Sequence, residues 1–144
     1  MKKAIVLIGA LITTMATLFA QNADVVKGTW MNDSKDAKVE IYKSGDKYFG
    51  KIIWAENMYE ADGKTLKKDS KNTNEEMKSR TILNMVILSG FTYDDGEWTG
   101  GEIYDPKSGK TYKSKMKIKG NSLEVRGYVG NPMFGKTTTW TRLS

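Results

Sequence analysis

The stretch that decides the fold is residues 90–112, Gly-Phe-Thr-Tyr-Asp-Asp-Gly-Glu-Trp-Thr-Gly-Gly-Glu-Ile-Tyr-Asp-Pro-Lys-Ser-Gly-Lys-Thr-Tyr. Two turn signals in it separate three runs that are typical of strands. Asp95-Gly96 is a dipeptide that accepts positive φ in a two-residue hairpin turn. Residues 105–109 place Pro where φ must be about −65° and Gly near the end of the turn. We therefore predict an antiparallel β-meander here.

Alternating polar and apolar residues extend this pattern in both directions. Val39 and Ile41 alternate with polar residues upstream, and Met116 and Ile118 alternate with a stripe of lysines downstream. A period of two predicts strands with one face in solvent. The lysine stripe is therefore interpreted as a solvated strand face rather than as an anion-binding rail. Eight candidate strands result, without a convincing long helix.

An antiparallel sheet of eight strands in one small domain closes most economically on itself, because closure removes its unpaired edges. We therefore predict an all-β fold, a single antiparallel, mostly up-and-down barrel of about eight strands. The polar insert at residues 57–80 interrupts the strand pattern and is too long for an ordinary connection, so we interpret it as a candidate lid. Within it, Asn74 followed by Glu75 and Glu76 predicts the start of a short helix.

The first 20 residues differ in kind from the rest. Lys2 and Lys3 precede an uncharged apolar run that ends at Ala20, which is the pattern of a cleaved secretory signal peptide. Three threonines weaken the run and no stop-transfer charge cluster follows it, so a leader is favoured over a retained membrane anchor. We expect residues 21–144 to form one exported domain, periplasmic or secreted, without a stable membrane anchor.

The 144 residues include neither cysteine nor histidine. These absences remove disulfides, thiol nucleophiles, the usual general base near neutral pH and nearly all zinc sites. We therefore expect no enzyme, no catalytic residues, no metal and no cofactor. Without Lys2 and Lys3 the formal charge falls from +6 to +4, which is too weak and too interspersed with acids to predict nucleic-acid binding. The sequence carries no signal for an oligomeric state.

Gly28-Thr29-Trp30, with Arg142 near the last strand, resembles the lipocalin signature. More of the chain resembles a bacterial family named domain of unknown function 2147, whose members are small exported proteins with a lipocalin-like barrel. Asn84 departs from its pattern, which usually has Gly near this position. The resemblance implies a ligand-holding barrel in which Trp30 and Arg142 form a structural plug. It is carried by Asp69, Asn72 and Arg80 of the insert, residues 98–101 (Trp-Thr-Gly-Gly), 105–112, 125–130 (Val-Arg-Gly-Tyr-Val-Gly) and 139–142 (Thr-Trp-Thr-Arg).

If the barrel closes, one parity of its strands surrounds a common interior. That lining is apolar with a few phenol groups and suits a lipid, a fatty acid or another amphipathic small molecule. The alternative is a filled barrel that serves as a non-enzymatic structural or interaction module of the cell envelope. Arg80, Lys110 and Arg126 are candidate contacts for an anionic head group. The predicted ligand-binding residues are Tyr48, Ile52, Trp54, Met85, Ile87, Ile103, Tyr112, Met116 and Val125.

Overall fold

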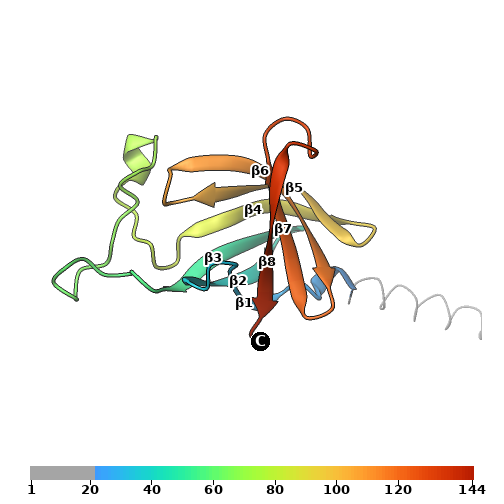
Figure 1. Cartoon of the computed structure of the whole chain (residues 1–144), viewed down its shortest axis with the longest axis horizontal. Helices are drawn as coiled ribbons and strands as arrows, with labels where there is room; N and C mark the ends of the chain where they lie inside the picture. The colour runs from blue at the N-terminus through green and yellow to red at the C-terminus, as the bar shows by residue number, and fades with distance from the viewer. Residues whose placement is uncertain (1–21) are drawn as a thin grey trace, which may run out of the picture.

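The computed structural model describes residues 22–144, so the predicted leader lies outside the described residues. Eight antiparallel strands form a closed barrel in which each strand pairs with its neighbours in sequence and β1 pairs with β8 (Figure 1). The predicted up-and-down barrel is confirmed. Its strands are β1 (Gly28–Met31), β2 (Ala37–Ser44), β3 (Lys47–Ala55), β4 (Val86–Asp94), β5 (Glu97–Asp105), β6 (Lys110–Lys119), β7 (Ser122–Tyr128) and β8 (Gly135–Arg142).

The meander predicted over residues 90–112 is present as the end of β4, all of β5 and the start of β6. Asp95 and Gly96 have φ of 46° and 87°, the pair of positive values that a tight hairpin turn requires. At the next turn the backbone N–H of Gly109 donates to the carbonyl of Asp105 at 2.8 Å. Local turn chemistry therefore sets the order of these three strands.

One half of the barrel, next to the β2–β3, β4–β5 and β6–β7 turns, is densely packed. Gly50 and Gly101 make room there, since a Cβ on Gly101 would lie 2.5 Å from the ring of Phe91 and one on Gly50 would lie 2.8 Å from Leu88. We call this half the packed end. Its nearly fully buried side chains include Trp30, Ile41, Tyr48, Leu88, Phe91, Trp98, Met116 and Leu123.

Trp30 and Arg142 close the packed end. The indole of Trp30 is fully buried and donates to the carbonyl of Val26 at 2.9 Å. The guanidinium of Arg142 lies 4.2 Å from the centroid of the Trp30 ring, within cation–π range. It also donates to the carbonyl of Lys27 at 3.2 Å, so one side chain ties β8 to the segment that precedes β1.

The predicted inward direction of Trp54 is wrong. Val39 lies opposite Ile52, whereas Lys38 lies opposite Trp54, so Ile53 is an extra residue on β3. A β-bulge of this kind moves the side chains that follow it to the other face of the strand. Trp54 therefore lies outward, with the Lys38 Nζ 5.1 Å from its ring centroid.

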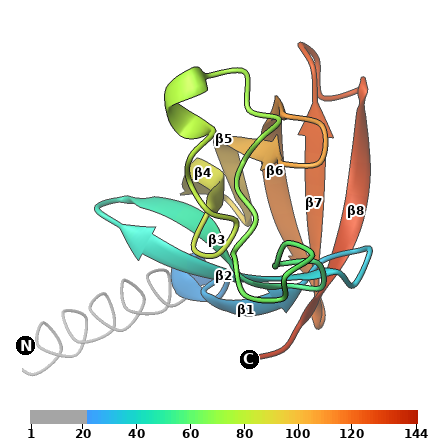
Figure 2. The same ribbon diagram turned by 90° about the vertical axis from the view of Figure 1, so that its left-hand side faces the viewer.

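The insert, residues 57–80, has structure of its own. Isolated bridges join Tyr59 to Leu66 and Lys68 to Thr81, and a short 3₁₀ helix, η1, spans Glu75–Met77. The side chain of Asn74 accepts from the N–H of Glu76 at 3.1 Å, so the predicted cap is confirmed. Figure 2 shows the insert running in front of the barrel strands. It returns to β4 through Asn84, whose φ of 65° is one that Gly or Asn adopts most readily.

Candidate ligand-binding cavity

The other half of the barrel is hollow. A cavity of about 1080 Å³ opens among the β1–β2, β3–β4, β5–β6 and β7–β8 connections, at what we call the open end. The barrel is thus neither wholly filled nor wholly open. Six of the nine predicted ligand-binding residues line the cavity: Ile52, Met85, Ile87, Ile103, Tyr112 and Val125.

Tyr48 and Met116 do not line this cavity, because both belong to the packed end. The Tyr48 hydroxyl donates to the carboxylate of Asp24 at 2.5 Å. Burial, followed by this hydrogen bond, raises the pKa of Tyr48, and the same bond lowers the pKa of Asp24. Met116 is 1 % exposed within the core. Their predicted inward direction holds, but the interior they face is filled.

The wall of the cavity also contains β7 and β8 residues that the sequence prediction missed. Trp140 and Thr138 face inward, and the indole of Trp140 donates to the Thr138 hydroxyl at 3.1 Å. Their alternation with outward threonines on β8 was a signal that could have identified them. At Gly127 the wall has no side chain. A Cβ there would lie 3.5 Å from Ile103 and 3.7 Å from Tyr112, which are ordinary contacts.

None of the three predicted head-group contacts lines the cavity. Arg80 pairs with Asp69, at 2.8 Å between Nε and the carboxylate. Arg126 donates to the carbonyl of Pro132 at 2.7 Å and to the hydroxyl of Thr137 at 2.8 Å, so it serves the β7–β8 turn. Lys110 is exposed outside the cavity.

The mouth of the cavity is rich in lysine instead. Five lysines line it beside three aspartates, Asp33, Asp36 and Asp105. One lysine, Lys107, donates to Asp36, and this bond raises the pKa of Lys107 and lowers the pKa of Asp36. The other four form no ion pair within residues 22–144. These four, which we call the mouth lysines, are Lys67, Lys68, Lys71 and Lys136.

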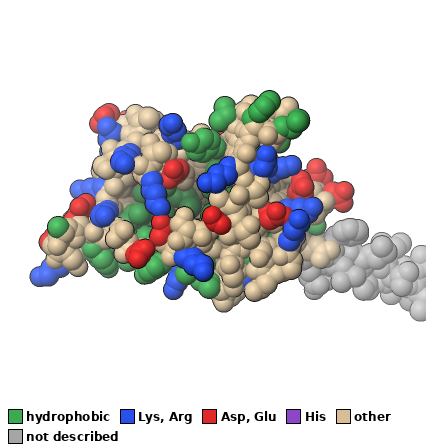
Figure 3. All heavy atoms as spheres, in the orientation of Figure 1, with side chains coloured by type: hydrophobic (Ala, Val, Ile, Leu, Met, Phe, Trp, Pro, Cys, Tyr) green, Lys and Arg blue, Asp and Glu red, His purple; other side chains and the backbone are tan. Residues whose placement is uncertain are grey.

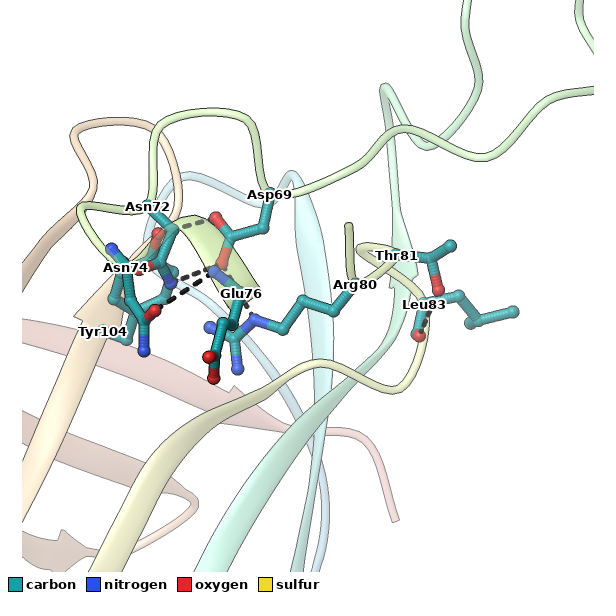
Figure 4. Close-up of polar contacts among 8 residues, drawn as sticks. All are labelled: Asp69, Asn72, Asn74, Glu76, Arg80, Thr81, Leu83 and Tyr104. Atoms are coloured by element: carbon teal, nitrogen blue, oxygen red, sulfur yellow. Dashed lines mark hydrogen bonds and ion pairs between the residues drawn. The ribbon is translucent and has the colours of Figure 1, made fainter. Parts of the chain in front are cut away.

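A buried carboxylate holds the insert against β5 (Figure 4). The side chain of Asp69 is fully buried and accepts from the Tyr104 hydroxyl at 2.6 Å, from Asn72 at 2.9 Å and from Arg80 at 2.8 Å. Burial alone would raise the pKa of Asp69, but these hydrogen bonds and the Arg80 charge together lower it. Burial and then the Asp69 bond raise the pKa of Tyr104 to about 12.

The β5–β6 turn packs directly on the insert at a second point. Gly109 has a φ of 76°, and a Cβ on it would overlap the carbonyl oxygen of Lys71. Only glycine allows this approach of two backbones. The Asp69 cluster and Gly109 together fix the insert segment that carries Lys67, Lys68 and Lys71 to the mouth.

Comparison with protein families assigns the chain. The model of the family described as "Uncharacterized protein conserved in bacteria (DUF2147)" matches residues 28–142, which is most of the barrel. The chain belongs to the DUF2147 family. The resemblance seen in the sequence is thereby confirmed. No curated protein matches this DUF2147 chain.

A solved structure supports the description of the fold. Protein HP1028 from Helicobacter pylori, described as belonging to the lipocalin family, is similar to this DUF2147 barrel with a TM-score of 0.71. The two chains share 27 % sequence identity, and the similarity covers 83 % of each. A lipocalin-like barrel is a fold that suits binding of small molecules rather than catalysis.

Within residues 22–144, no group of three or more Asp or Glu side chains is placed to hold a metal ion. No helix in the described part of the chain is long and apolar enough to cross a membrane.

One side-chain polar atom among residues 22–144 of the DUF2147 chain is buried without a partner, and it supplies a test of the packing. The hydroxyl of Ser114, on the inward face of β6, has no hydrogen bond among the described residues. An unsatisfied buried group costs about 1–3 kcal/mol, so Ser114→Ala is expected to raise the free energy of unfolding by about 1 kcal/mol. Urea unfolding measures this change. The exposed control Ser44→Ala should change the free energy of unfolding by less than about 0.5 kcal/mol. A loss of stability in Ser114→Ala would contradict the conclusion that the Ser114 hydroxyl is unsatisfied.

Proposed function

We propose that this DUF2147 protein is an exported binding protein for one apolar or amphipathic small molecule, lipid-like or fatty-acid-like, held in the barrel. The observation that carries the proposal is the hollow half of the barrel. It is lined by apolar side chains and opens at a mouth with four lysines that have no ion pair in the described part of the chain. Pockets for small ligands have this character, with apolar walls and a few convergent polar groups.

The apolar part of the ligand would lie against Ile52, Met85, Ile87 and Ile103. Each buried CH₂ group contributes about 0.8 kcal/mol to binding before entropic costs. Two polar groups in the wall are satisfied by the protein, since Trp140 donates to Thr138 and the Thr138 hydroxyl donates to the carbonyl of Val125 at 3.4 Å. The cavity interior therefore favours hydrocarbon over a polar chain.

The head of an amphipathic ligand would lie at the mouth, beside the mouth lysines. Lysine ammonium groups without ion pairs are available to a carboxylate or a phosphate as point charges. Because three of the four lysines are exposed and Lys67 is half-buried, their attraction for an anion weakens with salt. This assignment replaces Arg80, Lys110 and Arg126, whose side chains lie elsewhere.

The leader pattern at Lys2, Lys3 and Ala20 supports export, to the periplasm or the medium. The filled-barrel alternative has less support, because only one half of the barrel is filled. N-terminal sequencing of the exported protein tests removal of the leader, with Gln21 as the expected first residue.

Titration with a dansyl-labelled fatty acid tests ligand binding. The protein is expressed from the full chain and purified in its processed form, and we expect one fatty acid per barrel, displaced by the unlabelled acid. The neutral alcohol of equal chain length should bind about tenfold more weakly, as expected when one charge contact of about 1.4 kcal/mol is lost. Lys68→Gln/Lys71→Gln should remove this preference, whereas the outer-face control Lys113→Gln/Lys117→Gln should keep it. If neither the dansyl-labelled fatty acid nor the neutral alcohol binds saturably, the proposal is wrong.

A further inference from the structure

The turn between β7 and β8 displays the most exposed large apolar side chains of the described chain. Val129, Met133 and Phe134 are 70 %, 80 % and 74 % exposed, whereas no other large apolar side chain described exceeds 48 %. Figure 3 shows hydrophobic side chains gathered on the tip that these two strands form at the top of the view. We call these three residues the apolar tip.

The turn that carries the apolar tip is held in a defined shape. Besides its bond to Pro132, Arg126 donates to the carbonyl of Met133 at 3.4 Å. The side chain of Asn131 accepts from the N–H of Met133 at 2.9 Å, and the backbone carbonyl of Asn131 accepts from the N–H of Phe134 at 2.9 Å. These bonds hold the backbone of the turn while the three apolar side chains are exposed to solvent. Such an arrangement displays apolar surface instead of burying it.

The apolar tip is also part of the cavity mouth. Val129 and Phe134 line the cavity together with Lys136, which follows the turn on β8. The other mouth lysines, on the insert, share this rim. The open end therefore combines exposed apolar side chains with five lysines and three aspartates, an excess of positive charge, and four of the lysines have no ion pair within residues 22–144. A surface of this composition is complementary to lipid that carries negative head groups.

We propose that the apolar tip inserts into an anionic lipid surface and brings the mouth of the cavity against it. A lipid is the occupant that fits, because three side chains on one turn cannot supply the surface of about 800 Å² that a stable protein interface buries on each partner. Insertion into lipid needs no such area, since each apolar side chain is stabilised separately when it enters the boundary between head groups and acyl chains. Docking itself does not depend on the proposed ligand. Transfer of a lipid-like ligand through the docked mouth rests on the proposed function.

Vesicle co-sedimentation tests the docking without any added ligand. The processed protein is mixed with vesicles of equal parts phosphatidylglycerol and phosphatidylcholine, or of phosphatidylcholine alone. We expect binding to the anionic vesicles that weakens with salt. The affinity should fall about tenfold or more in Met133→Ser/Phe134→Ser, as expected from the burial of one large apolar side chain. The matched control Val25→Ser/Leu143→Ser removes two half-exposed side chains at the packed end and should bind like the parent.

A label reports which end enters the lipid. The chain has no cysteine, so Met133→Cys and Leu143→Cys each give one site for an environment-sensitive fluorophore. The emission at position 133 should shift to the blue on anionic vesicles and that at position 143 should not. Absence of binding by the parent, equal binding by the tip variant, or a shift at position 143 alone would overturn the proposal. A parent dimer that dissociates in the tip variant without vesicle binding would overturn it in favour of self-association.

Discussion

Replacing Asp69 by alanine is expected to lower the free energy of unfolding by about 3 kcal/mol and to release the insert from the barrel wall. The change leaves the Arg80 guanidinium and the Tyr104 hydroxyl without their common acceptor. Removing one partner of a buried ion pair typically costs about 3–5 kcal/mol. Because the Arg80 side chain is 27 % exposed, it recovers some hydration, and the lower end of this range applies.

Urea unfolding measures the loss of stability, and limited trypsin digestion measures the release of the insert, which carries Lys67, Lys68 and Lys71. The matched control is Asp62→Ala, an exposed carboxylate of the same insert that accepts only from its own turn at Lys64 and Thr65. The control should leave the unfolding midpoint and the rate of cleavage in the 67–71 segment nearly unchanged. Equal stability and equal cleavage in Asp69→Ala would mean that the cluster does not hold the insert.

The contribution of Asp69 also predicts a dependence on pH. Its pKa is lower in the folded protein than its ordinary value of 3.8. A depressed pKa stabilises the folded state fully above the unfolded value, and this contribution is lost as the pH falls through the folded value. The difference in stability between the parent and Asp69→Asn should therefore be constant near neutral pH and shrink below about pH 3.8. Asp24 and Asp36 titrate in both proteins, so the difference isolates Asp69.

Replacing Gly127 by leucine is expected to weaken binding of the dansyl-labelled fatty acid by about a hundredfold while the barrel stays folded. The backbone at Gly127 does not have a positive φ, and a Cβ there meets only ordinary contacts. The rest of the leucine side chain would enter the cavity and exclude about four CH₂ groups of a ligand. At about 0.8 kcal/mol each, that loss is about 3 kcal/mol, or two powers of ten in affinity.

Gly127→Ala is the control for this prediction, since one methyl group should reduce the affinity by less than about tenfold. Far-ultraviolet circular dichroism and thermal unfolding establish that both variants are folded. A folded Gly127→Leu protein that binds the probe as tightly as the parent would place the ligand outside the barrel. This result would leave the membrane-docking proposal standing, because vesicle binding is measured separately.

The fold was predictable because its signals are local. Asp95-Gly96 and residues 105–109 specify their turns within a few residues, and a period of two marks strands such as β2 and β6. Trp54 was mispredicted because the bulge at Ile53 lies between two apolar residues, where a change of face leaves no mark in the sequence. A one-residue shift is enough to move a side chain to the other face.

The candidate site was less predictable because the partners of its charged side chains depend on how the insert and the last turn fold. Arg80 finds Asp69 across the insert and Arg126 finds the carbonyls of a turn, so neither is available to a ligand. The division of the interior into a packed and a hollow half also depends on volumes that several strands contribute together. No single strand carries that information.

The seam between β1 and β8 has a consequence for how this protein reaches its folded state. Every other pair of neighbouring strands is adjacent in sequence, but the ring closes through a short ladder. Its pairs are Trp30 with Arg142 and Met31 with Thr141, and backbone hydrogen bonds of Thr29 with Leu143 and Ser144 extend it. Until β8 is available, a growing chain presents two unpaired strand edges that can pair with another molecule. The contact between Arg142 and Trp30 therefore helps to complete the closed barrel, after which no unpaired strand edge remains for aggregation.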